Sequence, residues 1–369
     1  MDPIPTHILK DKMVLKSVLP FLTKMVNKSL TSGVMPDGLK SALVFPHLKK
    51  PSLNPDTLSN YRPVSNLQFL GKIIEKSVAT QLCQHISRYN LGDSLQSAYK
   101  EAHSTETALL KVKRDCDNAL NSGKAVFLIL LDLSAAFDTI DHGILIDRLR
   151  TIVGVEGRAL DWLHSYVTGR SQKVVVNNSC SKSVPLQVGV PQGSVLGPLL
   201  FLIYIIPLSN LIKKHGLSHH GYADDTQIYI EFDPKTKDSL KNALHKIESC
   251  IEDIRKWMIL NKLKLNDDKT EAIIFASPRN LIKIKELHPT IKIGTADIYP
   301  RDSVRNLGVI MDSTITMQNH IKAITKSMYF HMRTIRQHYP APSQTRCFWT
   351  KSLLQLYQCI RCSLFNVKT

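Results

Sequence analysis

Three aspartates stand where a carboxylate is costly unless a cation meets it. Asp132 ends the apolar run "AVFLILL" (residues 125–131), and Asp224 and Asp225 are adjacent in "HGYADDTQIYIEF" (residues 220–232). A charge at the edge of a buried segment needs a compensating partner, and neighbouring carboxylates repel each other. Clustered carboxylates without a Cys/His set suit hard divalent cations such as Mg²⁺ or Mn²⁺. Two such ions activate a hydroxyl nucleophile and stabilise a departing phosphate oxygen.

The acid pair also has a simpler structural explanation, because aspartate is common in turns and a two-residue motif is short. Its value as a metal site depends on Asp132. If the strands that carry these acids are neighbours in one sheet, the carboxylates converge on one point. Asp138 and Asp141, in "FDTIDH", are instead expected to make loop hydrogen bonds and to cap a helix.

The elements that carry these acids are predicted to be strands. The unbroken apolar run 125–131 is typical of a central strand that is buried on both faces. After the acid pair, Ile228, Ile230 and Phe232 alternate with polar residues, which predicts a half-buried strand. "TEAIIF" (residues 270–275) predicts another strand. A hairpin is predicted from "QKVVVNN" and "SVPLQVG".

Helices alternate with these strands. The apolar residues between positions 238 and 258 recur at spacings of three and four, which predicts an amphipathic helix. Three further helices are predicted at residues 66–82, 104–120 and 197–212, the second opened by Ser104 or Thr105 as N-cap. Because hairpins interrupt the alternation, we expect an α+β fold with a largely antiparallel sheet, not a doubly wound one.

The charge balance favours a polyanionic partner. The 369 residues include 48 Lys+Arg and 31 Asp+Glu, a net charge of +17, so nucleic acid is the first candidate and a merely basic protein the alternative. The segment 313–369 has eight Lys/Arg and no acid. It is expected to lie against phosphates, unless it is a solvated basic face. A hydrophobic content of 43% excludes wholesale disorder.

The remaining composition favours an intracellular protein, in the nucleus and/or the cytoplasm. The start "MDPIPTHILK" lacks the pattern of a secretory signal, and the seven scattered cysteines are expected to be reduced. The apolar runs "AVFLILL" and "LLFLIYII" are too short to span a bilayer, so we expect core segments and no membrane partner.

Three ordered segments resemble a known family. "LDLSAAFDTIDH" (131–142), "GVPQGSVLGPLLFLIYI" (189–205) and "YADD" (222–225) resemble motifs A, B and C of the reverse transcriptases of LINE-type (non-long-terminal-repeat) retrotransposons, with jockey-like elements the nearest type. The resemblance covers roughly residues 10–340. Further similar segments are "NYRPVSNLQFLGKIIEK", "LQSAYKEAHSTETALLKV", "NKLKLNDDKTEAIIF" and "VRNLGVIMDSTITMQNHI".

The resemblance implies a right-hand polymerase core, within the α+β class. Fingers would occupy residues 1–124, and the palm residues 125–311 with a fingers excursion near 145–190. The reverse transcriptase domain would extend over about 45–311. Residues 312–369 would form a truncated, basic, helical thumb-like tail.

The implied activity is that of an RNA-directed DNA polymerase. It would add deoxynucleoside monophosphate from dNTP to a primer 3′-hydroxyl with two Mg²⁺ (or Mn²⁺) ions. Its partners would be an RNA template, a DNA primer or target DNA, and dNTPs. Beyond about Tyr339 the resemblance ends, which leaves the alternative of an inactive, nucleic-acid-binding relic of a degraded retrotransposon copy. DNA cleavage is not expected, and the oligomeric state stays open.

Carried over by position, the resemblance makes Asp132 and Asp224 the principal metal ligands. Asp225 would be a third acid at the same centre, and the Leu133 carbonyl a backbone ligand. Lys269 resembles a lysine that protonates the departing pyrophosphate, although a surface loop lysine is the alternative.

Five further positions are implied to bind the nucleotide. Arg62 and Lys100 are candidates for the triphosphate, and Lys100 stands where relatives often have Arg, so it lacks the bidentate fork. Phe137 would lie beneath the sugar and exclude a 2′-hydroxyl, which also argues against an RNA-dependent RNA polymerase. Gln192 would bind nucleotide or template, and Gly193 lets the backbone approach a ligand closely. The alternatives are solvated cations for Arg62 and Lys100, a core aromatic for Phe137, and a structural turn for Gln192 and Gly193.

Overall fold

The structure is a computed structural model that describes residues 8, 11–134, 136–177, 179–294 and 296–338. The chain forms two compact units, each assembled from separate segments. The first unit contains residues up to Tyr99, Asp132–Lys214 and Cys250–Asn266. The second unit contains Lys100–Leu131, His215–Ser249 and residues from Asp267 on.

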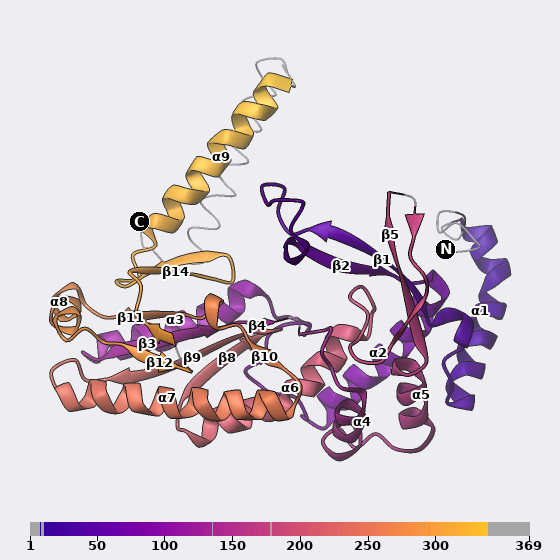
Figure 1. Ribbon diagram of the computed structural model, residues 1–369, viewed down its shortest axis with the longest axis horizontal. Coiled ribbons are helices and arrows are strands. Elements are labelled where there is room, and N and C mark those ends of the chain that lie inside the picture. Colours follow the sequence, from indigo (N-terminus) through magenta and orange to yellow (C-terminus); the bar gives the residue numbers. More distant parts are fainter. Residues whose placement is uncertain (1–7, 9–10, 135, 178, 295, 339–369) are drawn as a thin grey trace. The chain divides into compact units, whose positions relative to one another are not determined.

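The sheet of the second unit contains the predicted central strand. Its order is β11 (Glu271–Phe275), β3 (Ala125–Leu131), β9 (Asp225–Phe232) and β8 (Ser218–Tyr222), and every neighbouring pair is antiparallel (Figure 1). All residues of β3 except Leu130 are buried. The predictions of a buried strand at 125–131 and of a largely antiparallel sheet are confirmed.

One face of this sheet packs against α3 (Thr105–Asn121). The helix begins with a capping box, in which the Ser104 hydroxyl accepts from the Thr107 amide and the Thr107 hydroxyl accepts from the Ser104 amide. Its apolar face and alternate strand residues form one core. That core consists of Leu109, Val112, Cys116, Ala119, Val126, Leu128, Tyr229, Ile273, Phe275, Val304, Met311 and Met317.

Shorter elements complete the second unit. They are η4 (Asp267–Lys269), α8 (Pro278–Glu286), β12 (Ile291–Ile293), β13 (Ala296–Ile298), β14 (Ser303–Asn306) and β15 (Val309–Asp312). The last described element, α9 (Gln318–His338), contacts β15 and extends away from the sheet of its own unit (Figure 1). The predicted helical character of the tail is confirmed over α9, and residues 339–369 lie outside the described residues.

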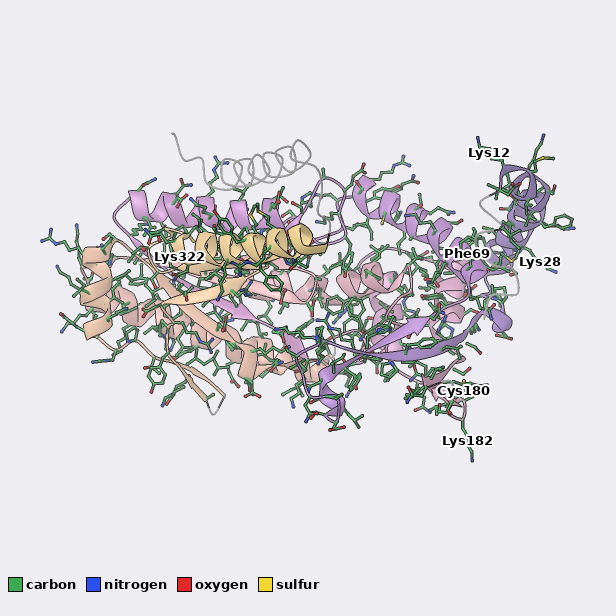
Figure 2. The ribbon with its side chains drawn as sticks, turned by 90° about the horizontal axis from the view of Figure 1, so that it is seen from above. Lys12, Lys28, Phe69, Cys180, Lys182 and Lys322 are labelled. Carbon is green, nitrogen blue, oxygen red and sulfur yellow. The ribbon has the colours of Figure 1, made fainter. Side chains whose placement is uncertain are left out.

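Helices dominate the first unit. α1 (Lys12–Ser32) contacts α2 (Phe69–Arg88) and α5 (Gly157–Val167), and α5 also contacts α4 (His142–Thr151) (Figure 1). The buried Trp162 ring of α5 stacks on Tyr166 with centroids 5.5 Å apart. Asp141 caps α4 by accepting the Ile144 amide at 3.0 Å, as predicted. On α1, Lys12 extends into solvent (Figure 2).

A second sheet belongs to the first unit. β1 (Ser41–Leu48) pairs antiparallel with β2 (Tyr61–Asn66) and parallel with β5 (Arg170–Val176). β5 pairs antiparallel with β7 (Val184–Leu186), which confirms the predicted hairpin. The short helices η2 (Asp37–Leu39) and η3 (Leu58–Asn60) precede β1 and β2 in the chain, and β6 (Ser179–Cys180) pairs antiparallel with the end of β5.

The apolar helix α6 (Gly197–Lys214) follows the segment "PQGSVL". Among the described helices it alone is long and apolar enough to cross a membrane, and half of it is buried inside the protein. Its buried residues include Leu200, Phe201 and Tyr204. A buried core helix of a soluble protein passes the same test of length and composition. The predicted helix at 197–212 is confirmed.

A long helix and a short strand pair are the remaining elements. α7 (Lys237–Leu260) confirms the predicted amphipathic helix, with residues up to Ser249 in the second unit and the rest in the first. In the first unit, β10 (Lys264–Leu265) pairs antiparallel with β4 (Leu133–Ser134). The α+β class is confirmed. The boundaries of fingers, palm and tail stay predictions.

Candidate active site

The register of the second unit's sheet shows whether the strands beside the three acids are neighbours. β3 and β9 are antiparallel neighbours, and Leu131, the last residue of β3, lies opposite Thr226. In the sequence, Asp132 follows Leu131 and Asp225 precedes Thr226. The condition set above, that the strands which carry the acids are neighbours, is therefore met.

The acid pair sits in a tight turn between β8 and β9. Tyr222 lies opposite Asp225, so Ala223 and Asp224 form a two-residue loop. Ala223 has a φ of +56°, in the left-handed region that residues other than glycine seldom adopt. Asp225 is exposed and Asp224 half-buried. The predicted turn and the strand that follows it are thus both present, and the metal-binding role of the pair stays a prediction.

Asp132 belongs to the first unit, where a second chain segment holds it. The Asn266 amide donates to the Asp132 carbonyl at 2.9 Å, and Asn266 Nδ2 donates to Oδ2 of the same residue at 3.1 Å. The next residue, Leu133, is buried and lies opposite Leu265 in the β4–β10 pair. Two hydrogen bonds therefore fix the backbone and the carboxylate of Asp132.

Two predicted cationic residues lie in the second unit. Lys269 is exposed at the end of η4, with one residue between it and β11, so its position before a strand is confirmed. Lys100 is half-buried and lies in the loop that precedes α3. Arg62 belongs to the first unit, where it is exposed on β2 opposite His47. The roles of Arg62 and Lys100 at the triphosphate, and of Lys269 in protonating pyrophosphate, stay predictions.

In the first unit, the segment that follows Asp132 lies beside the segment that contains Gln192. The Val190 amide donates to the Phe137 carbonyl at 2.9 Å, and the Gly189 amide donates to the Ile140 carbonyl at 2.7 Å. The resembled motifs A and B are therefore adjacent. Phe137 is half-buried and packs on Phe201, with ring centroids 5.1 Å apart.

The side chain of Gln192 is anchored by an acid. Its Nε2 donates to both carboxylate oxygens of Asp138, at 3.1 and 3.0 Å. The backbone carbonyl of Gln192 accepts a hydrogen bond from the Ser65 backbone amide at 2.7 Å. The loop hydrogen bonding predicted for Asp138 is confirmed, and it orients the residue predicted to bind nucleotide or template.

Gly193 makes the close approach that its motif requires. Its φ is +121°, and a Cβ atom there would lie 2.5 Å from the Ser65 carbonyl oxygen. Real Cβ atoms do not come so near a backbone oxygen, so a side chain would displace the loop. This close approach is to the protein's own β2 strand, and the approach to a ligand stays a prediction.

Three residues that contact the site were not predicted from the sequence. Ser65 and Asn266 contact predicted site residues through backbone or amide hydrogen bonds, which leave no pattern in a sequence. Glu75 is 1% exposed and accepts two amide hydrogen bonds from the segment before α6. Its signal was available, because a lone acid lies within the apolar face of the helix predicted at 66–82.

The described residues contain no preformed metal cage. No group of three or more His, Cys, Asp or Glu side chains is arranged there to hold a metal ion. Asp132 lies in one unit and the acid pair in the other. The metal assignment therefore stays a prediction that rests on donor chemistry and strand register.

Comparison with known proteins decides the family. The pattern of the family described as reverse transcriptase (RNA-dependent DNA polymerase) matches residues 48–311, more than half of the chain. The chain belongs to the reverse transcriptase family. The matched range contains all of the predicted site residues.

Relatives of known type confirm the resemblance to LINE-type enzymes. The RNA-directed DNA polymerase from mobile element jockey of Drosophila funebris is 24% identical over 365 residues, which cover 98% of this chain and 37% of the relative. Its counterpart from Drosophila melanogaster is 25% identical over 317 residues, 84% of this chain and 33% of the relative. The chain spans about a third of the length of these relatives.

Solved structures confirm the right-hand polymerase fold. Apo telomerase from Candida tropicalis, truncated from its C-terminal domain, matches with a TM-score of 0.52 over 82% of this reverse transcriptase chain and 59% of the telomerase chain. A second apo telomerase structure from the same organism gives a TM-score of 0.51. At 12% identity, this likeness concerns the fold alone.

Proposed function

We propose that this chain is an RNA-directed DNA polymerase that adds dNMP from dNTP to a primer 3′-hydroxyl on an RNA template. One observation carries the proposal. β3 and β9 are antiparallel neighbours, and the end of β3 that Asp132 follows lies opposite the start of β9, where the Asp224-Asp225 pair stands. Family membership supports the same chemistry.

The proposed metal ligands have suitable donors. The carboxylates of Asp132, Asp224 and Asp225 and the Leu133 carbonyl are the hard oxygen donors that Mg²⁺ and Mn²⁺ prefer. Two bound ions would supply Lewis-acid activation of the 3′-hydroxyl and stabilise the departing pyrophosphate. Asn266 holds Asp132 by its carbonyl and its carboxylate, which restricts the orientation of that ligand.

The remaining residues bind and orient the substrates. Asp138 holds the Gln192 amide by Nε2, so the carbonyl end of that amide is directed away from the carboxylate and is available to a base or sugar. Phe137 is held in place by Phe201 and would exclude a 2′-hydroxyl. Arg62 and Lys100 would neutralise the triphosphate, and Lys269 would protonate pyrophosphate.

Basic surfaces support nucleic-acid binding. On α9, Lys322 (labelled in Figure 2), Lys326 and Arg333 are exposed. Their spacings of four and seven residues place them on one face of the helix. With a net charge of +17, the chain would attract a template and primer in a salt-dependent manner. The proposed partners are an RNA template, a DNA primer or target DNA, and dNTPs.

Primer extension tests the proposal directly. The purified chain is given an RNA template, a DNA primer, dNTPs and Mg²⁺, beside the variant Asp224→Asn. We expect wild-type incorporation and a loss of roughly a hundredfold or more in the variant, because the substitution removes one charge from the metal centre. Asp297→Asn is the matched control, since it removes an exposed carboxylate from β13 of the same unit.

The outcomes separate the enzyme from the relic. Extension by wild type and by Asp297→Asn, with none by Asp224→Asn, supports the polymerase. If wild type is silent while it still binds an RNA–DNA duplex in a salt-sensitive way, the polymerase proposal fails for this chain. The inactive, nucleic-acid-binding relic then takes its place.

A further inference from the structure

A fully buried carboxylate lies in the middle of α2. Glu75 is 1% exposed, and Gly71, Ile74, Ala79 and Leu82 are the other buried residues of the same helix. An ionisable group in apolar surroundings is costly unless hydrogen bonds and an opposite charge satisfy it. The hydrogen bonds that Glu75 makes therefore reveal its role.

Both of its hydrogen bonds go to the segment that leads into α6. The Val195 amide donates to Glu75 Oε2 at 2.7 Å, and the Leu196 amide donates to the same oxygen at 3.1 Å. α6 begins at Gly197, whose own amide donates to the Ser194 hydroxyl at 2.9 Å. Amides at a helix start have no partner within the helix, and a carboxylate there also meets the positive end of the helix dipole.

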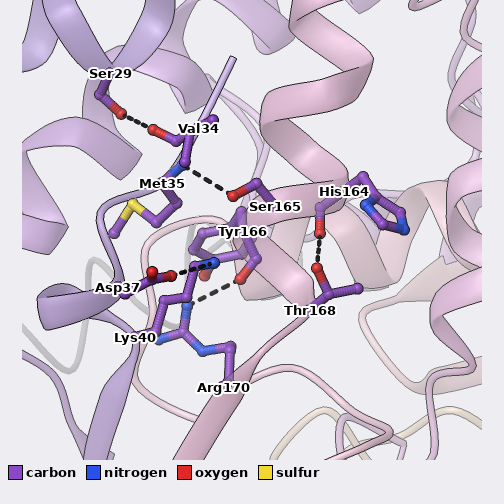
Figure 3. Close-up of polar contacts among 10 residues, drawn as sticks. All are labelled: Ser29, Val34, Met35, Asp37, Lys40, His164, Ser165, Tyr166, Thr168 and Arg170. Atoms are coloured by element: carbon purple, nitrogen blue, oxygen red, sulfur yellow. Dashed lines mark hydrogen bonds and ion pairs between the residues drawn. The ribbon is translucent and has the colours of Figure 1, made fainter. Parts of the chain in front are cut away.

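The charge of a buried arginine favours the ionised form of the carboxylate. Arg170 is 2% exposed, and its Nη1 donates to the Tyr166 carbonyl at 3.0 Å (Figure 3). Its Nε and Nη2 have no hydrogen-bond partner among the described residues. Burial raises the pKa of the Glu75 carboxyl, and the Leu196 and Val195 amides and the charge of Arg170 oppose that rise.

Glu75 holds one end of the segment that carries Gln192, and Ser65 holds the other. The Ser65 amide donates to the Gln192 carbonyl at 2.7 Å, and Gly193 packs directly on Ser65. Ser65 lies on β2 and Glu75 on α2, which follow each other in the chain. Consecutive elements of the first unit thus fix residues 192 to 196 from both sides.

We propose that Glu75, with Arg170 as its counter-charge, is a positioning residue that fixes the 192–196 segment and thereby sets the affinity for the incoming dNTP. The first clause, that Glu75 fixes the 192–196 segment, holds without substrate. Only the second clause, the effect on dNTP affinity, rests on the proposed function. Glu75 acts through the backbone and not by touching the nucleotide. Its loss should raise KM for dNTP more than it lowers kcat.

Amide hydrogen exchange tests the first clause without catalysis. In Glu75→Gln the acceptor becomes a neutral amide oxygen of the same shape, so the hydrogen bonds to Val195 and Leu196 weaken. We expect both amides to exchange on the order of tenfold faster than in wild type. Glu156→Gln is the matched control, because Glu156 is an exposed glutamate of the same unit whose side chain makes no cap hydrogen bond.

Primer-extension kinetics test the second clause. We expect Glu75→Gln to raise KM for dNTP on the order of tenfold, with kcat changed by less than about threefold.

The double variant Glu75→Gln/Arg170→Met removes both charges together. Because Arg170→Met alone leaves Glu75 buried without its counter-charge, that single variant should be less stable than the double variant.

Each outcome bears on one clause. Unchanged exchange at Val195 and Leu196 in folded Glu75→Gln overturns the positioning role, even if the enzyme is active. Faster exchange with an unchanged KM overturns the link to dNTP affinity. A wild-type chain without extension activity counts against the proposed function, whereas the exchange result still decides whether Glu75 holds the segment. Equal effects in Glu156→Gln would mean that the loss of any glutamate charge is responsible.

Discussion

The two regions that carry the predicted site residues are built in different ways. Asp224 and Asp225 lie at a strand start in the second unit, where register and a two-residue turn determine their place. Gln192 and Gly193 lie in an irregular segment of the first unit. That segment is held by Ser65, Asp138 and Glu75, which come from elements distant in sequence.

The difference shows which constraints a substitution removes. At the strand start, the backbone pairing of β8 and β9 holds the turn that carries the acids. Replacing one carboxylate there should remove chemistry and leave the scaffold intact. In the irregular segment, a few side chains carry the structure, and each replacement changes geometry. The first region should therefore respond in rate and the second in stability or substrate affinity.

The largest expected effect compares Asp132, a proposed metal ligand like the acid pair, with Asp138, which holds Gln192; the two lie six residues apart in the first unit. Asp132→Asn should lower kcat by roughly 10²–10³-fold, because it removes a proposed metal-binding charge. Asp138→Asn should raise KM for dNTP by about tenfold, because the Gln192 amide loses a charged acceptor. Single-turnover primer extension over a range of dNTP concentrations separates the two parameters.

Thermal unfolding of both variants is the control for that comparison, and both should unfold close to wild type. A fall in kcat for Asp138→Asn as large as that for Asp132→Asn would show that the acid beside Gln192 also takes part in the chemistry. The proposed division between a chemical and a positioning region would then be wrong.

Sequence patterns predicted the regular part of the fold well, because buried strands and helices leave a periodic signal. Residues 125–131 coincide with β3, and the helix predicted at 238–258 lies within α7. The hold on Gln192 was not predictable in the same way. Ser65 contributes a backbone amide, and Glu75 meets Val195 across 120 positions of sequence. Such contacts depend on tertiary structure. The lone acid within an apolar helix face indicates that Glu75 needs a partner, but no local pattern identifies that partner.

The next effect concerns the stability of the irregular segment. Gly193→Ala places a Cβ 2.5 Å from the Ser65 carbonyl oxygen at a φ of +121°. Because that oxygen belongs to a paired strand and does not yield cheaply, we expect unfolding free energy to fall by roughly 2–4 kcal/mol. Urea denaturation measures the change.

Gly154→Ala separates steric contact from backbone strain. Gly154 lies in the same unit at a φ of +73°, and a Cβ there meets no heavy atom within 4 Å. That variant should lose only about 1–2 kcal/mol, the cost of a left-handed conformation. Equal losses in the two variants would remove the close approach to Ser65 as the reason for glycine at position 193.

The smallest effect tests whether register or strain fixes the acid pair. Ala223 has a φ of +56° and Ala102 one of +58°, and both belong to the second unit. Ala102 is exposed, so Ala102→Gly should stabilise the fold by up to about 1 kcal/mol through relief of strain. Ala223 is 7% exposed, so Ala223→Gly also loses a buried methyl group of about 0.8 kcal/mol and should stay close to wild type in urea denaturation. If Ala223→Gly instead proves clearly more stabilising than Ala102→Gly, the turn stores strain beyond its dihedral angle. Strand pairing alone would then not explain the position of Asp224.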